Sequence, residues 1–447
     1  MTSRCDDIRE QDSVTKRSTA HPMKEVNSYY TEVKPSLPNF SPDVVSASSA
    51  LRAESVFSRL ILKIYAAGVV LRRTIPWLFI AVLIFVAAVE IFFLHLVIWF
   101  RRKRKAEESI YSRAREFIPE LSKQYPFGGH PILWKSIQLA LLRGYVAPFR
   151  KSIIVEAAIG EESLSSRVFD KDFSVIGLDI NPVSLQKVIG RPHISQAIVC
   201  DCMNPPLNKN SIDILVSNNF IHHVTDKEGV IRNWARAAAY VYFNECSQSW
   251  SEALLPSYFL HGIGFHDLAR RIAQTVNLLG AQCLLPRNEL DALFSREVQV
   301  EEVHAFISQF TYCMATIPSL VCLQMGPTPF EIRQALAGSL VEGLVDRLTK
   351  RLSELLLYLD QTSMRSADDV LIHYFCKSKS AKKRRSGGVI RCACGSEQGL
   401  SSEGICPACG RAYPKIDGML FVLPEHLSTI LDNYDGESAA AFPKEHL

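Results

Sequence analysis

The stretch that decides the fold is "IIVEAAIGEES", residues 153–163. An apolar run of strand type ends in an acid, Glu156, and a short turn then leads into a polar, acidic segment typical of a helix start. Such a turn usually carries glycines where the backbone must adopt positive φ or approach a ligand closely, and this one carries only Gly160. The stretch alone is therefore compatible with a ligand-binding loop, with a decayed one, or with a buried strand before an acidic helix.

The same alternation of a short apolar strand and a helix continues downstream, which predicts a parallel sheet covered on both faces. The further predicted strands are "FSVIGLDI" (173–180), "SQAIVCD" (195–201), "SIDILVSNN" (211–219) and "AAAYVYFNE" (237–245). A mostly helical region is expected from about 250 to 360. It ends in "DDVLIHYFCKSK" (368–379), which reads as a last strand.

Three successive predicted strands end in or near an acid, namely Glu156, Asp179 and Asp201. In an open parallel sheet, ligands bind at the carboxyl ends of the strands, so these acids mark one candidate site. Asp179 follows Glu156 at a spacing close to that at which an acid meets a ribose hydroxyl in nucleotide-binding units. A carboxylate there can accept two hydroxyl donors.

These segments, in this order, resemble the class I S-adenosylmethionine-dependent methyltransferases, most closely the group that methylates small molecules and lipids. The resemblance rests on "VEAAIG", "VIGLDIN", and "IVCDCMNPPLNKNSIDILVSNNFIHHV" with its Ile-His-His-Val segment after the fourth strand. It implies an α/β, Rossmann-like methyltransferase sheet with a helical insertion and an antiparallel strand near residues 370–376. It also implies S-adenosylmethionine as the cofactor.

Carried over by position, the resemblance implies a role for each residue of the site. The methionine part of the cofactor would meet the loop after the first strand, the ribose the second strand, and adenine the third, with the reactive methyl group over the fourth. The implied cofactor-binding residues are Glu156, Ala158, Gly160, Asp179, Ile180, Asp201, Cys202 and Asn218.

The departure from the family lies in the loop, where Ala158 and Glu162 stand at two usual glycine positions. Ala158 adds one methyl group. Glu162 places a carboxylate either near the cofactor's own carboxylate or in the first turn of a helix, where negative charge is favourable. A loop that no longer binds cofactor, in a purely structural domain, is the alternative interpretation.

Methyl transfer needs mainly alignment of the acceptor, and it needs a base only if the acceptor loses a proton. We take His222 and His223 as the candidate catalytic residues, with a core-facing histidine as the alternative for His223. For Glu245 a structural role is the favoured interpretation. His261 and His266 are further candidates for facing the acceptor.

Four cysteines near the C-terminus form two close pairs, and these predict a structural zinc ion held by Cys392, Cys394, Cys406 and Cys409. A module this small has too little apolar core to fold without a metal. Its end, "CGRAYPKIDGMLFVL", resembles the small zinc-ribbon proteins that activate methyltransferases. The resemblance implies that the ribbon stabilises the enzyme or helps it meet its substrate. Free cysteines in a tail are the alternative.

The run "IPWLFIAVLIFVAAVEIFFLHLVIWF" (75–100) is long and apolar enough to span a bilayer as a helix. A buried core helix is the alternative, but such helices are rarely apolar around their whole circumference. The run is followed by "RRKRK" (101–105), which by the positive-inside tendency predicts a single-pass membrane protein with its catalytic domain in the cytoplasm.

The expected organisation of the 447 residues therefore has seven parts. They are a disordered region (1–50), an amphipathic juxtamembrane segment (51–74), a transmembrane helix (75–100), a methyltransferase-like domain (106–378), a basic linker (379–388), a zinc ribbon (389–424) and a tail (425–447). The net charge of +4 is too small to indicate nucleic-acid binding, and the linker lacks aromatic residues for base stacking.

We expect a membrane-anchored methyltransferase that transfers methyl groups by in-line displacement to a small-molecule, lipid or lipid-linked acceptor. Its partners would be the bilayer and this acceptor, and a protein partner is compatible with the ribbon. Two alternatives remain. One is an inactive methyltransferase-like scaffold that binds partners through the ribbon, and the other is an RNA or protein methyltransferase.

Overall fold

The computed structural model describes residues 76–100, 108–160, 167–279, 283–323, 329–363, 368–380, 388–424, 427–432 and 434. The expected disordered N-terminal region, the juxtamembrane segment, the "RRKRK" run and most of the basic linker and tail lie outside these residues, as does Glu162.

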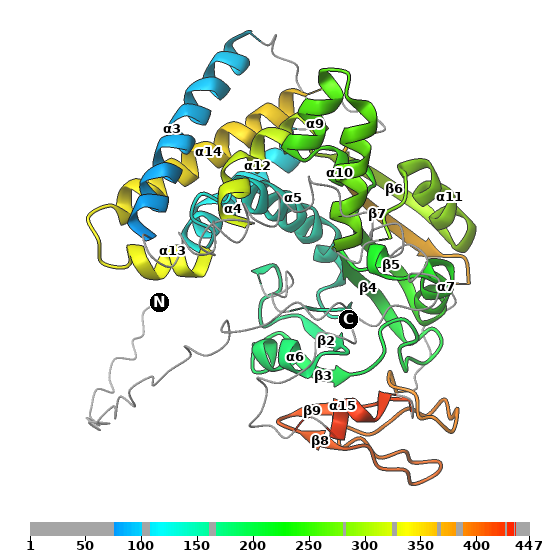
Figure 1. Ribbon diagram of the computed structural model, residues 1–447. Coiled ribbons are helices and arrows are strands. Elements are labelled where there is room, and N and C mark those ends of the chain that lie inside the picture. The colour runs from blue at the N-terminus through cyan, green and yellow to red at the C-terminus, as the bar shows by residue number, and fades with distance from the viewer. Residues whose placement is uncertain are drawn as a thin grey trace, which may run out of the picture. The chain divides into compact units, whose positions relative to one another are not determined.

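A nine-stranded sheet with the order β6-β7-β5-β4-β1-β2-β3-β9-β8 forms the centre of the described chain (Figure 1). The strands are β1 (Ile153–Ala157), β2 (Ser174–Asp179), β3 (Ile194–Val199), β4 (Ile212–Asn218), β5 (Ala238–Cys246), β6 (Val298–Phe306), β7 (Leu371–Ser378), β8 (Lys415–Ile416) and β9 (Met419–Phe421). β1 to β5 pair in parallel, whereas β7 runs antiparallel to β5. The α/β sheet with an antiparallel strand near residues 370–376 is thus confirmed.

β6 corrects the expectation of a mostly helical region between residues 250 and 360. It pairs antiparallel with β7 at the edge of the sheet, and its centre is largely exposed. An edge strand with charged side chains on its open side lacks the apolar run that marks buried strands, so the sequence pattern did not reveal it.

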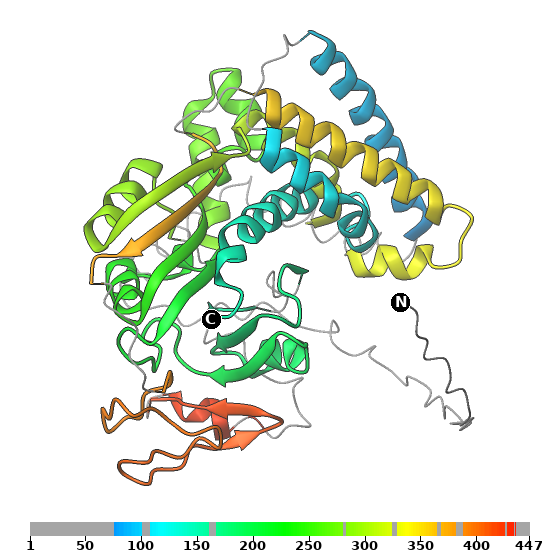
Figure 2. The same ribbon diagram turned by 180° about the vertical axis from the view of Figure 1, so that it is seen from behind.

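The strands are buried on both faces because alternate side chains point to opposite sides of the sheet. Ile154, Ile214 and Tyr242 belong to a core shared with α4, α5, α12 and α14, whereas Val155 and Leu215 belong to a second core shared with α7 and α11. Figures 1 and 2 show these helices on the two sides of the strands. Two layers of helices over one sheet leave the carboxyl ends of β1 to β5 as the place for a ligand.

The helices of the described chain range in length from the 3 residues of η1 to the 25 residues of α3. The helices are α3 (Pro76–Phe100), α4 (Glu108–Gln124), α5 (Gly129–Val146), η1 (Ala147–Phe149), α6 (Pro182–Val188), η3 (Ile221–His223), α7 (Lys227–Ala237), α8 (Ser249–Glu252), α9 (Leu255–Gly262), α10 (His266–Leu279), α11 (Arg287–Glu297), α12 (Gln309–Leu323), α13 (Pro329–Leu336), α14 (Glu342–Thr362) and α15 (Thr429–Asp432).

The apolar helix α3 packs one side against α12, α13 and α14. Ile80, Leu83 and Ala87 are buried on this side, whereas Phe85 and Phe92 are exposed on the other. By length and composition, the segment Ile80–Trp99 could cross a membrane, and 28% of its most apolar window is buried. The helix therefore combines one packed side with one open apolar side.

The cysteine module continues the sheet. β9 pairs in parallel with β3, and Val422 N–H donates to the carbonyl of Val199 over 2.9 Å. Leu420 and Ile390 of the module belong to the same apolar core as β1 and β4. The module is thus the outer edge of the sheet, a contact that the sequence pattern did not predict.

Candidate active site at the carboxyl ends of the strands

The loop after β1 begins with two residues in the left-handed region of backbone conformation. Ala158 has φ +54° and Gly160 has φ +64°. Glycine adopts this region freely, whereas a residue with a Cβ is strained there. Apart from its chain neighbours, no atom of the described residues lies within 4 Å of where a Cβ on Gly160 would stand. Ala158 therefore fills a position that favours glycine, which is a larger departure than one added methyl group.

Asp179 at the end of β2 holds this loop in place. Its Oδ2 accepts from the Gly160 N–H over 2.8 Å, and its Oδ1 accepts from the Asn181 N–H over 2.8 Å. The side chain is buried, and burial raises its pKa more than the N–H groups of Asn181, Gly160 and Ile180 lower it. A carboxylate has about four acceptor sites, so Asp179 keeps capacity for further hydroxyl donors.

The end of β3 meets the same loop. The Cys202 side chain is buried, and its sulfur lies close enough to the Ala158 N–H for that group to act on its pKa. Its pKa is raised well above the usual range by hydrogen bonding to Cys200, by burial and by the nearby charge of Asp179. Asp201 beside it is half-buried, and its Oδ1 accepts from the Met203 N–H over 2.8 Å. The structure therefore brings the ends of β1, β2 and β3 together.

Glu156 and Ile180 flank this group. Glu156 lies inside β1, between Gly177 of β2 and Val216 of β4, and is 2% exposed. Ile180 follows directly on Asp179 and is half-buried.

Glu245 and His222 form a buried pair at the ends of β5 and β4. His222 Nδ1 lies 2.9 Å from Glu245 Oε2, and Glu245 Oε1 accepts from the N–H groups of Phe220 and Ile221. Burial by itself lowers the pKa of His222, but the Cys246 sulfur and the Glu245 carboxylate together raise it to about 10. The imidazole is therefore protonated near neutral pH, and the pair fixes the segment after β4.

Polar atoms without a hydrogen-bond partner gather at the same two strand ends. Within the described residues, Ser217 Oγ, Asn218 Nδ2, Asn219 Oδ1 and Asn244 Oδ1 are buried and unpaired. Asn219 also has φ +54°, and its N–H donates to the Asn244 carbonyl over 2.7 Å. Buried polar atoms normally have partners, so this group is suited to a polar ligand.

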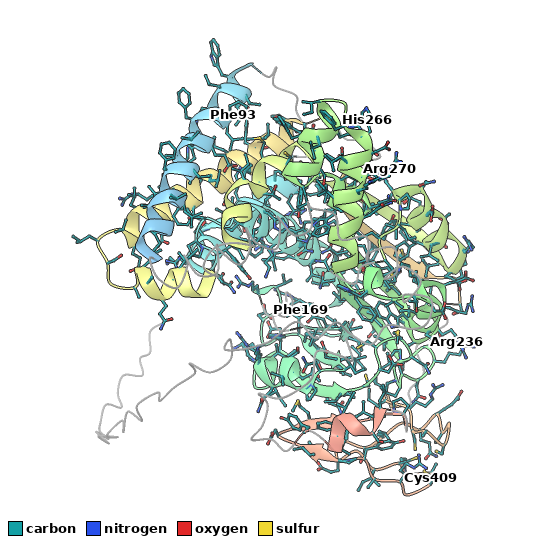
Figure 3. The ribbon with its side chains drawn as sticks, in the orientation of Figure 1. Phe93, Phe169, Arg236, His266, Arg270 and Cys409 are labelled. Atoms are coloured by element: carbon teal, nitrogen blue, oxygen red, sulfur yellow. The ribbon has the colours of Figure 1, made fainter. Side chains whose placement is uncertain are left out.

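The remaining candidate histidines lie on the surface. His223 is exposed, with its ring centroid 4.1 Å from that of His222, so it is not the core-facing histidine of the alternative interpretation. His261 and His266 are exposed and 4.4 Å apart between ring centroids. Figure 3 shows His266 on α10, far from Phe169, which follows the β1 loop.

The sequence reasoning missed Ser217 and Asn244. Each is polar and stands at the end of an apolar strand, as Asn218 does. That signal was present, but only the fold shows that β4 and β5 are neighbours whose ends meet.

The four cysteine sulfurs of the module lie within 4.8 Å of one another. Two pairs, Cys392–Cys409 and Cys394–Cys406, are each 3.7 Å apart. Around a tetrahedral zinc ion with Zn–S bonds of about 2.3 Å, neighbouring sulfurs are about 3.8 Å apart. The residues present therefore fit a four-thiolate metal site.

Residues 155–239, from β1 into the start of β5, match the family model described as "Methyltransferase domain". No curated protein matches this chain significantly. The chain thus carries a methyltransferase domain, and the prediction of a methyltransferase is confirmed at this level.

Solved structures similar to this chain include two methyltransferases and a cyclopropane synthase. They are geranyl diphosphate C-methyltransferase from Streptomyces coelicolor A3(2) (10% identity, 54% of this chain, 78% of that chain, TM-score 0.30), mycolic acid cyclopropane synthase CmaA1 (12%, 54%, 85%, 0.33) and phosphoethanolamine N-methyltransferase 2 from Haemonchus contortus (12%, 53%, 52%, 0.32). Similarity at this level says nothing about which acceptor this chain uses.

Proposed function

We propose that this chain is an S-adenosylmethionine-dependent methyltransferase that acts on a small-molecule or lipid acceptor and is anchored to a membrane by α3. The observation that carries the proposal is the meeting of the Ala158–Gly160 loop, Asp179 and Cys202 at three neighbouring strand ends, inside a matched methyltransferase domain. These groups stand where a cofactor binds in an open parallel sheet.

Each strand end would hold a different part of the cofactor. Asp179 would accept the ribose hydroxyls, Asp201 and Cys202 would meet adenine, and Glu156 with the β1 loop would hold the methionine part. The unpaired atoms of Asn218 and Asn244 support a polar contact beside the reacting centre. S-adenosylmethionine would supply a methyl group already activated on a sulfonium sulfur.

The protein's own contribution would be alignment, since an activated methyl group needs an acceptor held in line. His222 is protonated and paired with Glu245, so we assign it a positioning role for the segment after β4. His223, which is exposed next to it, is our candidate for receiving a proton from the acceptor.

A structural zinc ion is part of the proposal. The sulfur spacing fits a tetrahedral ion, and the two Cys pairs would occupy all four positions, which leaves none open for catalysis. The pairing of β9 with β3 supports a role for the module within this chain, and this favours an enzyme over a scaffold whose ribbon binds partners.

The open side of α3 supports the membrane anchor. Phe85, Phe92 and Trp99 are exposed, whereas Glu90 is buried on the packed side. We propose that the apolar side meets lipid and that the domain after residue 100 faces the cytoplasm. Removal of residues 76–100 should release the chain from membranes into the soluble fraction, and retention in the membrane would contradict the anchor.

The activity is tested by titrating the zinc-loaded full chain, in detergent, with S-adenosylmethionine in a calorimeter. We expect saturable binding, followed by transfer of labelled methyl groups into a membrane extract. Absence of binding at millimolar S-adenosylmethionine would contradict the proposal that the chain is an enzyme and would favour the inactive scaffold. Salt-sensitive RNA binding in a shift assay would instead favour an RNA methyltransferase.

A further inference from the structure

Three polar side chains form a row along one side of α5. His130, Trp134 and Gln138 follow one another at intervals of four residues, so they are neighbours on the helix surface. Within the described residues, His130 Nδ1, Trp134 Nε1 and Gln138 Nε2 are all buried without a hydrogen-bond partner. Trp134 is 7% exposed and Gln138 is 2% exposed.

The first two residues of the row contact α12. The ring of Tyr312 on α12 lies 4.9 Å from that of His130 and 6.2 Å from that of Trp134, between centroids. Trp134, Tyr312 and Cys246 of β5 belong to one buried core, and Cys246 Sγ lies 3.5 Å from His222 Nδ1. The row therefore lies in the core that reaches the end of β5 in the proposed active site.

Unpaired buried donors are costly, because each loses its hydrogen bonds to water and gains none in return, at about 1–3 kcal/mol per group. Three unpaired buried groups stand in successive turns of one helix, and two of them, Trp134 Nε1 and Gln138 Nε2, are donors, so the row is suited to a ligand that supplies their partners. Most other side chains of α5 are apolar and belong to the core, and its remaining polar side chains are Lys135, Ser136, Arg143 and the hydroxyl of Tyr145.

The chemistry of the row selects the ligand. An indole N–H is a donor only, so the ligand must present an acceptor atom to Trp134. Burial, followed by the charge of Lys135, lowers the pKa of His130 to about 4, so this side chain is neutral near pH 7. Lys135 itself bonds the hydroxyl of Tyr125 and is not turned to the row. The three side chains of the row are neutral and stand among apolar and aromatic side chains, so the row itself suits a neutral oxygen, and Lys135 is the charge that acts on it.

We propose that His130, Trp134 and Gln138 bind the methyl acceptor, and that this acceptor is a largely apolar molecule with a neutral hydroxyl or carbonyl oxygen. Trp134 and Gln138 would donate to that oxygen, while Tyr312 and the apolar side chains around it would cover the hydrocarbon part. The inference rests on the proposed function, since it names the substrate class of the same site.

The test uses three water-soluble probes of equal chain length, namely 1-hexanol, hexanoate and hexyltrimethylammonium, with the full chain in detergent. Saturation-transfer NMR measures the binding of each probe, and calorimetry with S-adenosylmethionine is run on the same samples. The variants are Trp134→Phe, which removes the N–H and keeps an aromatic ring, and Gln138→Met, which keeps the length. Trp99→Phe, on the exposed end of α3, is the matched control.

We expect 1-hexanol to bind best and to lose about fivefold in affinity in each α5 variant, the factor for one neutral hydrogen bond. Trp99→Phe should bind as the wild type does, and cofactor affinity should be unchanged in all three variants. Tightest binding of hexyltrimethylammonium would overturn the inference in favour of an aromatic cation site. Equal hexanol binding in wild type and α5 variants would also overturn it. If the chain binds hexanol and not cofactor, the proposed function fails and the α5 site stands as a binding site alone.

Discussion

The ends of β1, β2 and β3 differ from the ends of β4 and β5 in how their polar groups are satisfied. We call the ends of β1, β2 and β3 the first half of the site, and the ends of β4 and β5 the second half. In the first half, the Asp179 carboxylate accepts two backbone N–H groups and the Asp201 carboxylate accepts one. In the second half, Asn218 and Asn244 each keep an unpaired buried atom. Among the described residues, Asp179 and Asp201 of the first half have backbone partners without a ligand, whereas Asn218 and Asn244 of the second half hold buried atoms that have none.

This difference indicates a division of labour. A loop held by a neighbouring carboxylate is organised before a ligand arrives, and organisation in advance lowers the entropy lost on binding. Unpaired polar atoms act differently. They destabilise the empty site, and a ligand that supplies their hydrogen-bond partners gains binding free energy. We infer that the first half holds the cofactor and that the second half and α5 select the acceptor.

The largest effect should follow loss of the cysteine module, which supports the outer edge of the first half. Cys406→Ser should remove the metal, lower the melting temperature by about 10 °C or more and weaken cofactor binding, because β9 pairs with β3 next to Cys200. Metal content, thermal unfolding and calorimetry measure these effects. Cys283→Ser, an exposed cysteine outside the cluster, should change none of them. A metal-free variant with wild-type cofactor affinity would contradict the coupling.

Breaking the Glu245–His222 pair should have the next largest effect. Glu245→Gln leaves the buried His222 without its charged partner, and loss of one member of a buried pair costs about 3–5 kcal/mol. Thermal unfolding at pH 7 measures the loss. Glu302→Gln is the control, because Glu302 pairs with His304 on the exposed face of β6 and should matter little.

The same pair predicts a pH dependence. The pKa of His222 in the folded protein is about 10, above its ordinary value of 6.5. Its contribution to stability is therefore complete below about pH 6.5 and is lost as the pH rises towards 10. The melting temperature of the wild type should fall across this range, while that of His222→Gln should fall less. Parallel curves for the two proteins would rule out the protonated pair.

Replacing Asp179 should weaken cofactor binding and leave the second half intact. Asp179→Asn removes a charged acceptor from the Gly160 N–H and from the proposed ribose contact, and we expect about 100-fold weaker binding by calorimetry. Asn244→Ala is the counterpart in the second half. It should keep cofactor affinity within about threefold and reduce methyl transfer by at least about tenfold. If Asn244→Ala weakened cofactor binding and Asp179→Asn did not, the proposed division between the two halves would be wrong.

The smallest effects should appear at the β1 loop, in opposite directions. Ala158→Gly relieves a side chain at positive φ and should stabilise the protein by up to about 1 kcal/mol, whereas Gly160→Ala should destabilise it by about 1 kcal/mol. The same φ sign at both positions makes each variant the control of the other. Thermal unfolding without ligand measures both, and a change of the same sign in both would show that φ does not govern this loop.

The sequence by itself determined the parallel sheet, because a strand that is buried on both faces consists of a short, continuous run of apolar residues. Such runs can be recognised directly in the sequence. It also determined the acids at the strand ends and the four cysteines, since their spacing along the chain is the signal. The edge strand β6 was not predicted, because about half of its side chains face solvent and it lacks a continuous apolar run.

Only the tertiary structure decided which of these residues meet. Ala158 and Gly160 have positive φ next to Asp179 of the neighbouring strand, which accepts from the Gly160 N–H, and no local pattern in the sequence predicts that bond. Asn244 joins Asn218, β9 joins β3, and Trp134 faces Tyr312 across segments far apart in the chain. Sequence patterns report the neighbours along one strand or helix, whereas a site is made where several elements end. Its unpaired atoms can be recognised only when all of those ends are in place.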